Sequence, residues 1–142
     1  MRDRFVIDAS VVVKWFIEEE GSERAEQLLD ARVDLYAPRI LLGEVANALW
    51  KSVRRGEVPM PLAEEALRRL PRTIRFLFDT DDILTDVLQM AVALDHPIYD
   101  CLYVAGARRR ELSLVTADAR LIRKFSASPY ASTILPLSEW RA

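Results

Sequence analysis

Short apolar runs alternate along the chain with longer segments in which apolar residues recur at helical spacing. A short apolar run bounded by turn or charged residues is typical of a strand that is buried on both faces of a sheet. Such strands are expected at residues 4–8, 34–38, 73–78, 112–116 and 132–137. Helical segments separate them, and this arrangement favours parallel pairing, since tight turns join only antiparallel strands.

The helical segments are predicted at residues 9–19, 22–31, 39–56, 61–71, 81–95, from Pro97 onward and around 119–125. Ser10 is expected to cap the first helix, and Ser22 begins the second, because a serine hydroxyl accepts hydrogen bonds from the free N–H groups of a first turn. The segment 39–56 is the clearest helix. It has basic residues in its last turn and Gly56 just beyond, as is typical of a helix end.

This order of elements predicts the fold class. Strands that alternate with helices favour an α/β protein, a three-layer α/β/α sandwich around a central parallel sheet of about five strands. No repeat, low-complexity tract or linker rich in Pro, Gly or Ser divides the 142 residues. Since a chain of this length matches one ordinary domain, residues 1–142 are expected to form a single domain.

The composition narrows the chemistry that the chain can support. One cysteine, Cys101, and one histidine, His96, exclude an internal disulfide and a structural zinc site with the usual ligands. Cys101 is interpreted as a core residue. A formal net charge of −2 gives no indication of nucleic-acid binding by itself. The N-terminus MRDRFVIDAS lacks a secretory signal pattern, and no apolar run approaches the ~18 residues of a membrane span. A cytoplasmic protein that does not enter a membrane is expected.

Four acidic residues occupy positions that the predicted fold brings to one edge of the sheet. Asp8 ends the first strand, and Asp118 lies two residues beyond the fourth. Glu44 lies on the apolar stripe of the clearest helix, and Asp100 lies in the first turn of the penultimate helix. Open parallel sheets bind ligands in the crevice at the carboxyl ends of their strands, and helices that follow strands begin there. The four carboxylates are therefore expected to converge on this edge.

Four carboxylates in one small site repel one another, which raises their pKa values and opposes folding. A bound divalent cation removes this difficulty, and oxygen ligands without cysteine or histidine select a hard ion, Mg²⁺ or Mn²⁺. Such an ion activates water and stabilises the leaving oxygen in phosphodiester hydrolysis. The sequence thus predicts a metal-dependent phosphodiesterase with Asp8, Glu44, Asp100 and Asp118 as metal ligands.

Each acidic residue also has a purely structural interpretation. Asp100 in a first turn complements the helix dipole, Asp118 is a suitable N-cap for the following helix, and Asp8 suits a cap or turn at a strand end. Glu44 has few structural uses on an apolar stripe apart from a buried pair with arginine.

Several other residues are given structural interpretations. His96 is interpreted as a turn residue. Gly43 and Gly106 each lie inside a predicted helix at a cost of about 1 kcal/mol relative to alanine, and both are attributed to close packing. The basic residues of 108–110 and 120–124 are interpreted as solvated faces. They flank the acidic positions in sequence, where an RNA backbone could be held.

Three segments resemble the PIN-domain ribonucleases, and within them the VapC-type toxins of type II toxin–antitoxin pairs. VIDASVVVKWFIEEEGSERAEQLL resembles the opening strand of this family with its aspartate and following serine. APRILLGEVANALWKSVRRG resembles its glutamate-bearing helix. ALDHPIYDCLYVAGARRRELSLVTADARL is similar to the block that carries the third and fourth acidic residues. The resemblance covers nearly the whole chain; one departure is Gly106, where a larger helix former is expected.

The resemblance implies a PIN-like fold and a Mg²⁺- or Mn²⁺-dependent endoribonuclease that acts as the toxin of its pair. It also implies a homodimer and a cognate antitoxin that inserts into the active-site groove. The four acidic metal-site positions of the family correspond to Asp8, Glu44, Asp100 and Asp118. Ser10 and Thr116 match the small hydroxyl residues beside that site, where they would orient ligands or waters.

Two other classes of function are compatible with acidic residues at strand ends. An aspartyl-phosphate phosphotransferase needs a nucleophilic aspartate with a helper carboxylate or lysine, and the sequence DAS after the first strand lacks the second aspartate of the common two-aspartate motif. A non-catalytic partner-binding module would be favoured by the loss of any of the four acidic residues, and none is lost.

Overall fold

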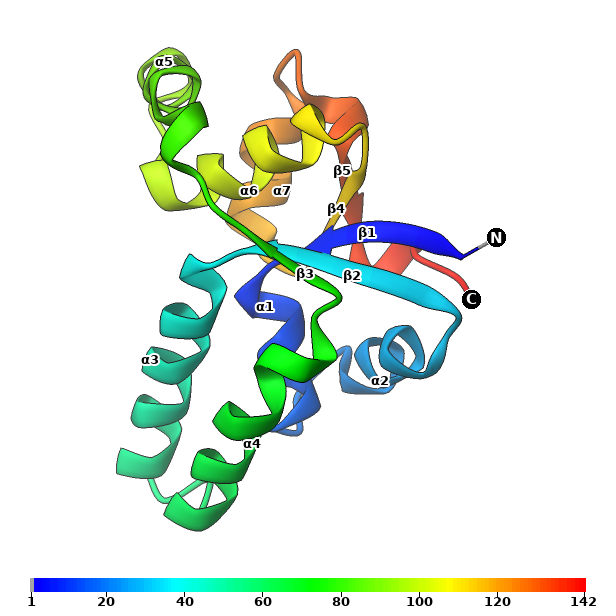
Figure 1. Cartoon of the computed structure of the whole chain (residues 1–142), viewed down its shortest axis with the longest axis vertical. Coiled ribbons are helices and arrows are strands. Elements are labelled where there is room, and N and C mark those ends of the chain that lie inside the picture. The colour runs from blue at the N-terminus through cyan, green and yellow to red at the C-terminus, as the bar shows by residue number, and fades with distance from the viewer. Residues whose placement is uncertain (1) are drawn as a thin grey trace.

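The computed structural model describes residues 2–142, and its centre is a five-stranded sheet in which every pairing is parallel. The strands are β1 (Asp3–Ile7), β2 (Val33–Pro38), β3 (Phe76–Phe78), β4 (Ser113–Thr116) and β5 (Ile134–Pro136). Their order is β3-β2-β1-β4-β5 (Figure 1). The chain leaves the central strand β1 toward β2 and β3 and returns on its other side at β4. The strand order therefore reverses between β1 and β4, where sheets of this kind bind ligands.

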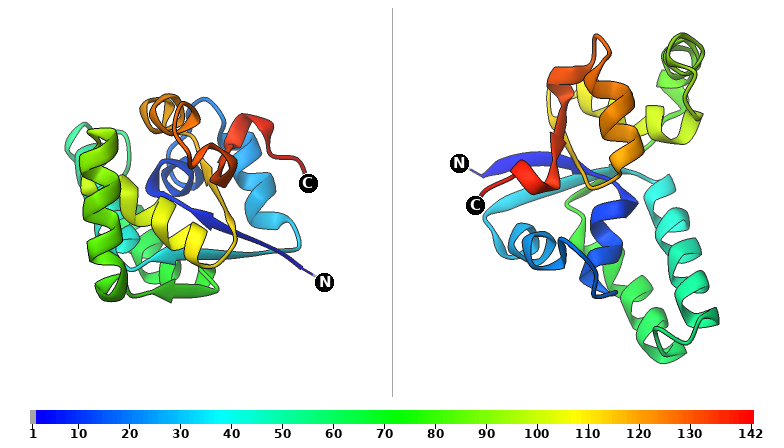
Figure 2. Two further views of the ribbon diagram at one scale, coloured as in Figure 1. Left: turned by 90° about the horizontal axis from the view of Figure 1, so that it is seen from above. Right: turned by 180° about the vertical axis from the view of Figure 1, so that it is seen from behind.

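Helices cover both faces of this sheet, as the two views of Figure 2 show. One face carries α1 (Ala9–Val12), α2 (Ser22–Asp30), α3 (Ile40–Arg54) and α4 (Met60–Thr73). The other face carries α5 (Leu84–Leu94), α6 (Ile98–Arg109) and α7 (Ala119–Ser126). Right-handed crossovers that run in opposite directions from β1 place their helices on opposite faces. The expected three-layer α/β/α sandwich is confirmed.

The first helix differs from its prediction. α1 ends at Val12, and a 3₁₀ turn over Val13–Trp15 follows it instead of a regular helix to residue 19. The expectation that Ser10 caps this helix is wrong, because β1 runs straight into the helix and Asp8, with extended backbone, occupies the N-cap position. Ser10 lies inside the first turn, which leaves its hydroxyl free for partners across the sheet edge.

Other boundaries also shift. β1 ends at Ile7 and not at Asp8, and β5 covers only Ile134–Pro136 of the predicted run 132–137, between two 3₁₀ turns. Residues up to Thr73 belong to α4, so β3 is shorter than the predicted run 73–78. The helix predicted over 81–95 begins with a 3₁₀ turn at Asp81–Ile83 and ends at Leu94. Within residues 2–142, no helix combines the length and the apolar character needed to cross a membrane.

The two glycines inside helices have different surroundings. A Cβ built on Gly106 of α6 would lie 2.5 Å from Cε2 of Phe78 in β3, closer than real Cβ atoms approach. Glycine therefore allows α6 to lie directly against the ring of Phe78, which explains the departure from the family pattern. A Cβ on Gly43 of α3 would meet no atom within 4 Å. Close packing is the correct interpretation for Gly106 and the wrong one for Gly43.

Candidate functional site

The centre of the acidic edge is Asp8, which lies between the ends of two neighbouring strands. The register of β1 and β4 places Asp8 beside Thr116, whose Oγ1 donates to Asp8 Oδ2 at 2.5 Å. Ser10 Oγ donates to Asp8 Oδ1 at 2.5 Å and accepts from the backbone N–H of Ala117 at 2.9 Å. Both oxygens of this buried carboxylate are therefore fixed by hydroxyl groups.

Burial raises the pKa of Asp8 from 3.8 to about 6. The hydrogen bonds from Ser10 and Thr116 lower this pKa, while the nearby negative charges of Asp100 and Asp118 raise it further. The charges of Asp100 and Asp118 thus reach Asp8. Together with burial, they disfavour the charged form of Asp8 relative to a solvated carboxylate.

Glu44 lies in the second turn of α3, immediately after β2, and is half-buried. Its Oε1 accepts a hydrogen bond of 2.5 Å from the hydroxyl of Tyr103, a buried residue of α6. Burial raises the pKa of Glu44, the bond from Tyr103 lowers it, and the charge of Asp100 raises it. The partner of this carboxylate on the apolar stripe is therefore a tyrosine and not an arginine.

Asp100 lies in the first turn of α6, and its partner is His96. The two side chains are joined by a bond of 2.7 Å between His96 Nε2 and Asp100 Oδ2, and an ionised carboxylate accepts there from the ring N–H. The imidazole is only 2% exposed and lies edge-on to Phe125, with ring centroids 5.2 Å apart. The turn interpretation of His96 missed this contact, although its spacing of four residues from Asp100 was a visible signal.

Asp118 caps α7. Its Oδ1 accepts from the backbone N–H groups of Arg120 (3.0 Å) and Leu121 (3.2 Å), so the capping interpretation of this residue is confirmed. Its own N–H donates to Thr116 Oγ1 at 3.1 Å, which ties the cap to the Asp8 cluster. A cap that uses one oxygen leaves the second oxygen available to another ligand.

The four carboxylates supply oxygen donors, but their side chains are not grouped into a complete metal-coordination site. Among residues 2–142, no group of three or more His, Cys, Asp or Glu side chains is arranged to hold a metal ion. The donor chemistry nevertheless fits a hard divalent cation. Asp8 and Glu44 are repelled by neighbouring carboxylates, and a bound positive charge would offset this repulsion. Mg²⁺ usually keeps several waters and takes only one or two carboxylates directly. The residues present therefore fit such an ion without a three-carboxylate cage.

Basic side chains surround one flank of the acidic edge. Arg120, Arg123 and Lys124 of α7 line a hollow of about 300 Å³ together with Asp95 and His96. Because His96 also bonds Asp100, this hollow adjoins the acidic edge. An anionic backbone at this position would meet three cations.

The interpretation of residues 108–110 as a solvated face is wrong for Arg110. Its guanidinium lies 3.8 Å from the ring centroid of Phe78, and desolvation lowers its pKa.

The fold is an open parallel α/β sandwich whose acidic residues lie at the reversal of the strand order, where sheets of this class bind ligands. The profile of the PIN domain matches residues 5–126, and this chain belongs to the PIN-domain family.

The chain is similar to Ribonuclease VapC3 of Pyrobaculum aerophilum, with 32% identity over 126 residues that make up 87% of this chain and 96% of the relative. The resemblance to VapC-type members of the family is thereby confirmed.

Solved structures share the fold. The match to the crystal structure of PAE2754 from Pyrobaculum aerophilum spans 96% of this chain and 85% of the PAE2754 chain, with a TM-score of 0.71 and 26% identity. The match to one chain of a toxin–antitoxin complex from Klebsiella pneumoniae spans 96% of this chain and 99% of that chain, with a TM-score of 0.67 and 15% identity. The second likeness concerns the fold alone.

Proposed function

We propose that this chain is a Mg²⁺- or Mn²⁺-dependent endoribonuclease and the toxin of a toxin–antitoxin pair. Asp8, Glu44, Asp100 and Asp118 would hold the cation. The observation that carries the proposal is the electrostatic coupling of Asp8 with Asp100 and Asp118, and of Glu44 with Asp100, at the strand-order reversal of a PIN-domain chain. The relative named Ribonuclease VapC3 supports RNA as the substrate.

When bound, a divalent cation acidifies water and stabilises charge on the leaving oxygen of a phosphodiester. The chain's own residues supply the preorganised frame. Ser10 and Thr116 fix both oxygens of Asp8, and His96 and Tyr103 fix one oxygen each of Asp100 and Glu44. These partners hold the carboxylates in orientation, as groups behind metal ligands commonly do.

A circular single-stranded RNA tests both the reaction and its dependence on metal. The purified protein should linearise the circle with Mg²⁺ or Mn²⁺ present and should leave it closed in EDTA. A circle has no ends, so opening it requires cleavage inside the strand. Undiminished opening in EDTA would exclude the metal-dependent reaction, and cleavage of linear RNA alone would exclude an endonuclease.

Growth measurements test the role as a toxin. Expression without a partner should arrest cells, and Asp8→Ala or Asp100→Ala should relieve the arrest while the protein still accumulates. Continued toxicity of both variants at parental protein levels would contradict the site assignment.

The proposal includes a cognate antitoxin that occupies the active-site groove and a homodimeric toxin, both acting in the cytoplasm. The fold shared with the protein of the Klebsiella pneumoniae toxin–antitoxin complex is compatible with such a partner. Light scattering of the purified chain tests the dimer. Co-purification with the product of a small adjacent gene, with loss of RNA cleavage in the complex, tests the antitoxin.

The phosphotransferase alternative is less well supported by the residues that follow Asp8. The common two-aspartate motif places a second aspartate beside the nucleophile, whereas Ala9 and Ser10 follow Asp8 here. Mass spectrometry after incubation with a phosphate donor distinguishes the two, because only a phosphotransferase forms a covalent phosphoprotein.

A further inference from the structure

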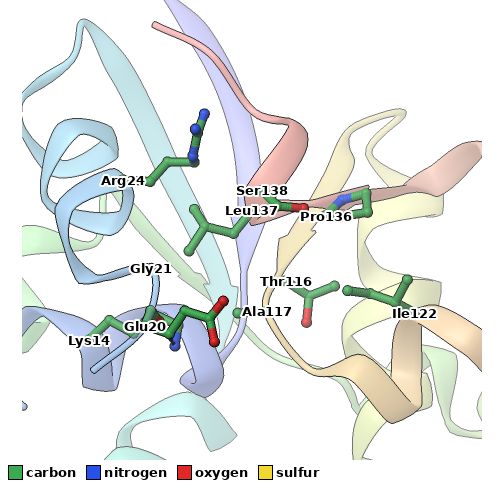
Figure 3. A pocket seen from close by; sticks show the side chains of 10 residues that line it. All are labelled: Lys14, Glu20, Gly21, Arg24, Thr116, Ala117, Ile122, Pro136, Leu137 and Ser138. Carbon is green, nitrogen blue, oxygen red and sulfur yellow. Dashed lines mark hydrogen bonds between the residues drawn. The ribbon is translucent and has the colours of Figure 1, made fainter. Parts of the chain in front are cut away.

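A cavity separate from the basic hollow lies beside the Asp8 cluster. Its volume is about 440 Å³, and the residues that shape it include Lys14, Arg24, Thr116, Ile122, Leu137 and Ser138. Figure 3 shows Lys14 and Arg24 on one side, Thr116 and Ile122 on the other, and Leu137 between them. Because Thr116 Oγ1 donates to Asp8, the wall of the cavity is one side chain away from Asp8.

The lining of this cavity combines apolar surface with charges of both signs, because the side chain of Glu20 lines it together with Lys14 and Arg24 (Figure 3). Leu137 is buried and forms the apolar centre of the wall with Ile122. Lys14 Nζ is held by Glu19 Oε1 at 3.0 Å and by the carbonyl of Glu20 at 2.7 Å. The guanidinium of Arg24 is anchored by a single Nη1 bond to the carbonyl of Trp140. Lys14 is thus paired with a carboxylate of the chain, and Arg24 is the cation whose printed partner is a neutral carbonyl, beside a wall that suits a flat apolar face.

The backbone at Gly21 keeps one side of the cavity open. This residue has φ of +88°, a conformation that residues with a Cβ rarely adopt, and it ends the turn before α2. A Cβ here would lie 3.4 Å from Cε of Lys14 and 3.6 Å from Cδ2 of Leu137. Glycine therefore leaves clear the space between the lysine stem and the apolar wall.

We infer that this cavity binds one unpaired nucleotide of the RNA, next to the phosphodiester that is cut, and thereby sets a base preference. The inference rests on the proposed ribonuclease function and adds a specificity site to it. Single-stranded RNA is read by splaying individual bases into pockets, while basic side chains hold the backbone. A volume of about 440 Å³ lies within the range of small-molecule sites.

The contrast with the basic hollow explains why the base is assigned to this cavity. The hollow beside His96 has a volume of about 300 Å³ and is lined by charged side chains and the histidine. It offers cations to phosphate groups but no apolar wall to a base. The cavity at Leu137 has an apolar wall with Arg24 beside it, so an RNA strand that passes Asp8 would have its backbone held at the basic hollow and a base inserted in this cavity.

The test uses three single-stranded RNAs of one cleavable sequence: the intact RNA, one with an abasic ribose immediately 5′ of the cut, and one with an abasic ribose immediately 3′ of it. With the parent protein, kcat/KM should fall by roughly 10-fold or more for one of the two abasic RNAs, because that RNA lacks the apolar face that is buried against the wall. No loss with either abasic RNA overturns the inference without any substitution in the protein.

Two tryptophan variants complete the experiment. Ser138→Trp fills the cavity from an exposed position, and it should lower kcat/KM for the intact RNA while leaving cleavage of the sensitive abasic RNA at the parental rate. The control is Ser132→Trp, the same change at another exposed serine. Ser132 lies near Ser113, where β4 begins, and therefore at the end of the sheet away from the acidic edge. This control should cut all three RNAs like the parent. Thermal melting curves confirm that both variants are folded.

The remaining outcomes are decisive. If Ser138→Trp slows the intact and abasic RNAs by the same factor, or slows neither, the cavity does not take a base. If it instead abolishes inhibition by the antitoxin and leaves RNA cleavage unchanged, the occupant is a protein and the inference is wrong. Failure of the parent to cut any RNA contradicts the proposed function itself, which is a distinguishable result.

Discussion

The acidic edge is built in two different ways on its two sides. Asp8 stands at the end of a central strand, is buried, and is fixed by hydroxyls from the adjoining helix turn and from the neighbouring strand. Glu44 and Asp100 stand on helices from opposite faces of the sheet, are half-buried, and are each fixed by one partner on or next to α6. The strand side depends on sheet register, and the helix side depends on how α6 packs.

This difference indicates where the edge is rigid and where it can adjust. Hydrogen-bonded parallel strands fix the separation of Asp8 and Thr116 closely. A helix packed through side chains can shift by the width of a methyl group, because its position depends on side-chain volume. We therefore expect changes at Asp8 to act on charge and chemistry, and changes around α6 to act on the positions of Glu44 and Asp100.

The largest effect is expected from Asp8→Asn. Cleavage of RNA should fall by roughly 100-fold or more, because a central charge of the site is lost while its shape remains. The Asn variant should nevertheless be more stable than the parent at pH 8 in EDTA. Loss of activity with unchanged stability at all pH values would contradict the burial argument for Asp8.

The sign of the pH dependence follows from the raised pKa of Asp8, about 6 against 3.8. A carboxyl group whose pKa is raised by folding stabilises the folded state at low pH and loses that contribution as the pH rises through about 6. The difference in pKa corresponds to about 3 kcal/mol in full, of which about 2–3 kcal/mol falls between pH 4 and pH 8. Unfolding curves of the parent and Asp8→Asn in EDTA should therefore diverge by about this amount across the interval.

Two substitutions at His96 test whether its bond to Asp100 affects the binding of a metal ion on the helix side of the acidic edge. His96→Phe keeps the packing against Phe125 but removes the bond to Asp100, whereas His96→Gln can still donate to Asp100 from its amide. Metal affinity, measured by titration calorimetry with Mn²⁺, should fall by about 10- to 100-fold in the Phe variant. The Gln variant should recover part of this loss, and equal affinity in all three proteins would show that His96 has no effect on the site.

A smaller effect on stability is expected from Gly106→Ala, for which Gly43→Ala is the matched control. The new methyl group at position 106 would collide with Phe78, so the variant should lose about 1–3 kcal/mol of unfolding free energy. The control introduces the same methyl group into open space on α3 and should gain up to about 1 kcal/mol from helix propensity. Denaturant unfolding measures both, and equal effects would contradict the packing of α6 on β3.

The smallest effect is expected from Tyr103→Phe, which removes only the hydroxyl that bonds Glu44. Because Glu44 is half-buried and can bind water instead, the cost should be about 1 kcal/mol. A double-mutant cycle with Glu44→Leu, which has no acceptor, followed by urea unfolding, isolates the pairwise contribution. A coupling of zero would show that the hydrogen bond does not stabilise the edge.

The local sequence pattern was sufficient to predict most of the secondary structure. It failed to predict element boundaries that depend on contacts between residues far apart in the chain. The alternation of apolar strands and amphipathic helices predicted all five strands and the parallel sheet, because strand and helix periods are local properties of the chain. The length of α1 and the start of β3 were not predictable in this way. The first depends on Asp8 taking the N-cap position straight after β1, and the second on α4 continuing to Thr73.

The sequence by itself determined which end of the sheet carries the acidic residues. Asp8 and Asp118 lie within two residues of strand ends, and Glu44 and Asp100 lie in the first two turns of helices, so chain direction alone assigns them to the carboxyl edge. Tertiary structure decided their partners and their protonation, because hydrogen bonds such as Thr116 to Asp8 and Tyr103 to Glu44 join residues far apart in the chain.

Tertiary structure also decided the cavity at Leu137, which is shaped by segments from Lys14 to Ser138 that no local pattern relates. Periodicity reports which face of an element is buried, whereas the distance between two elements depends on the volume of every side chain between them.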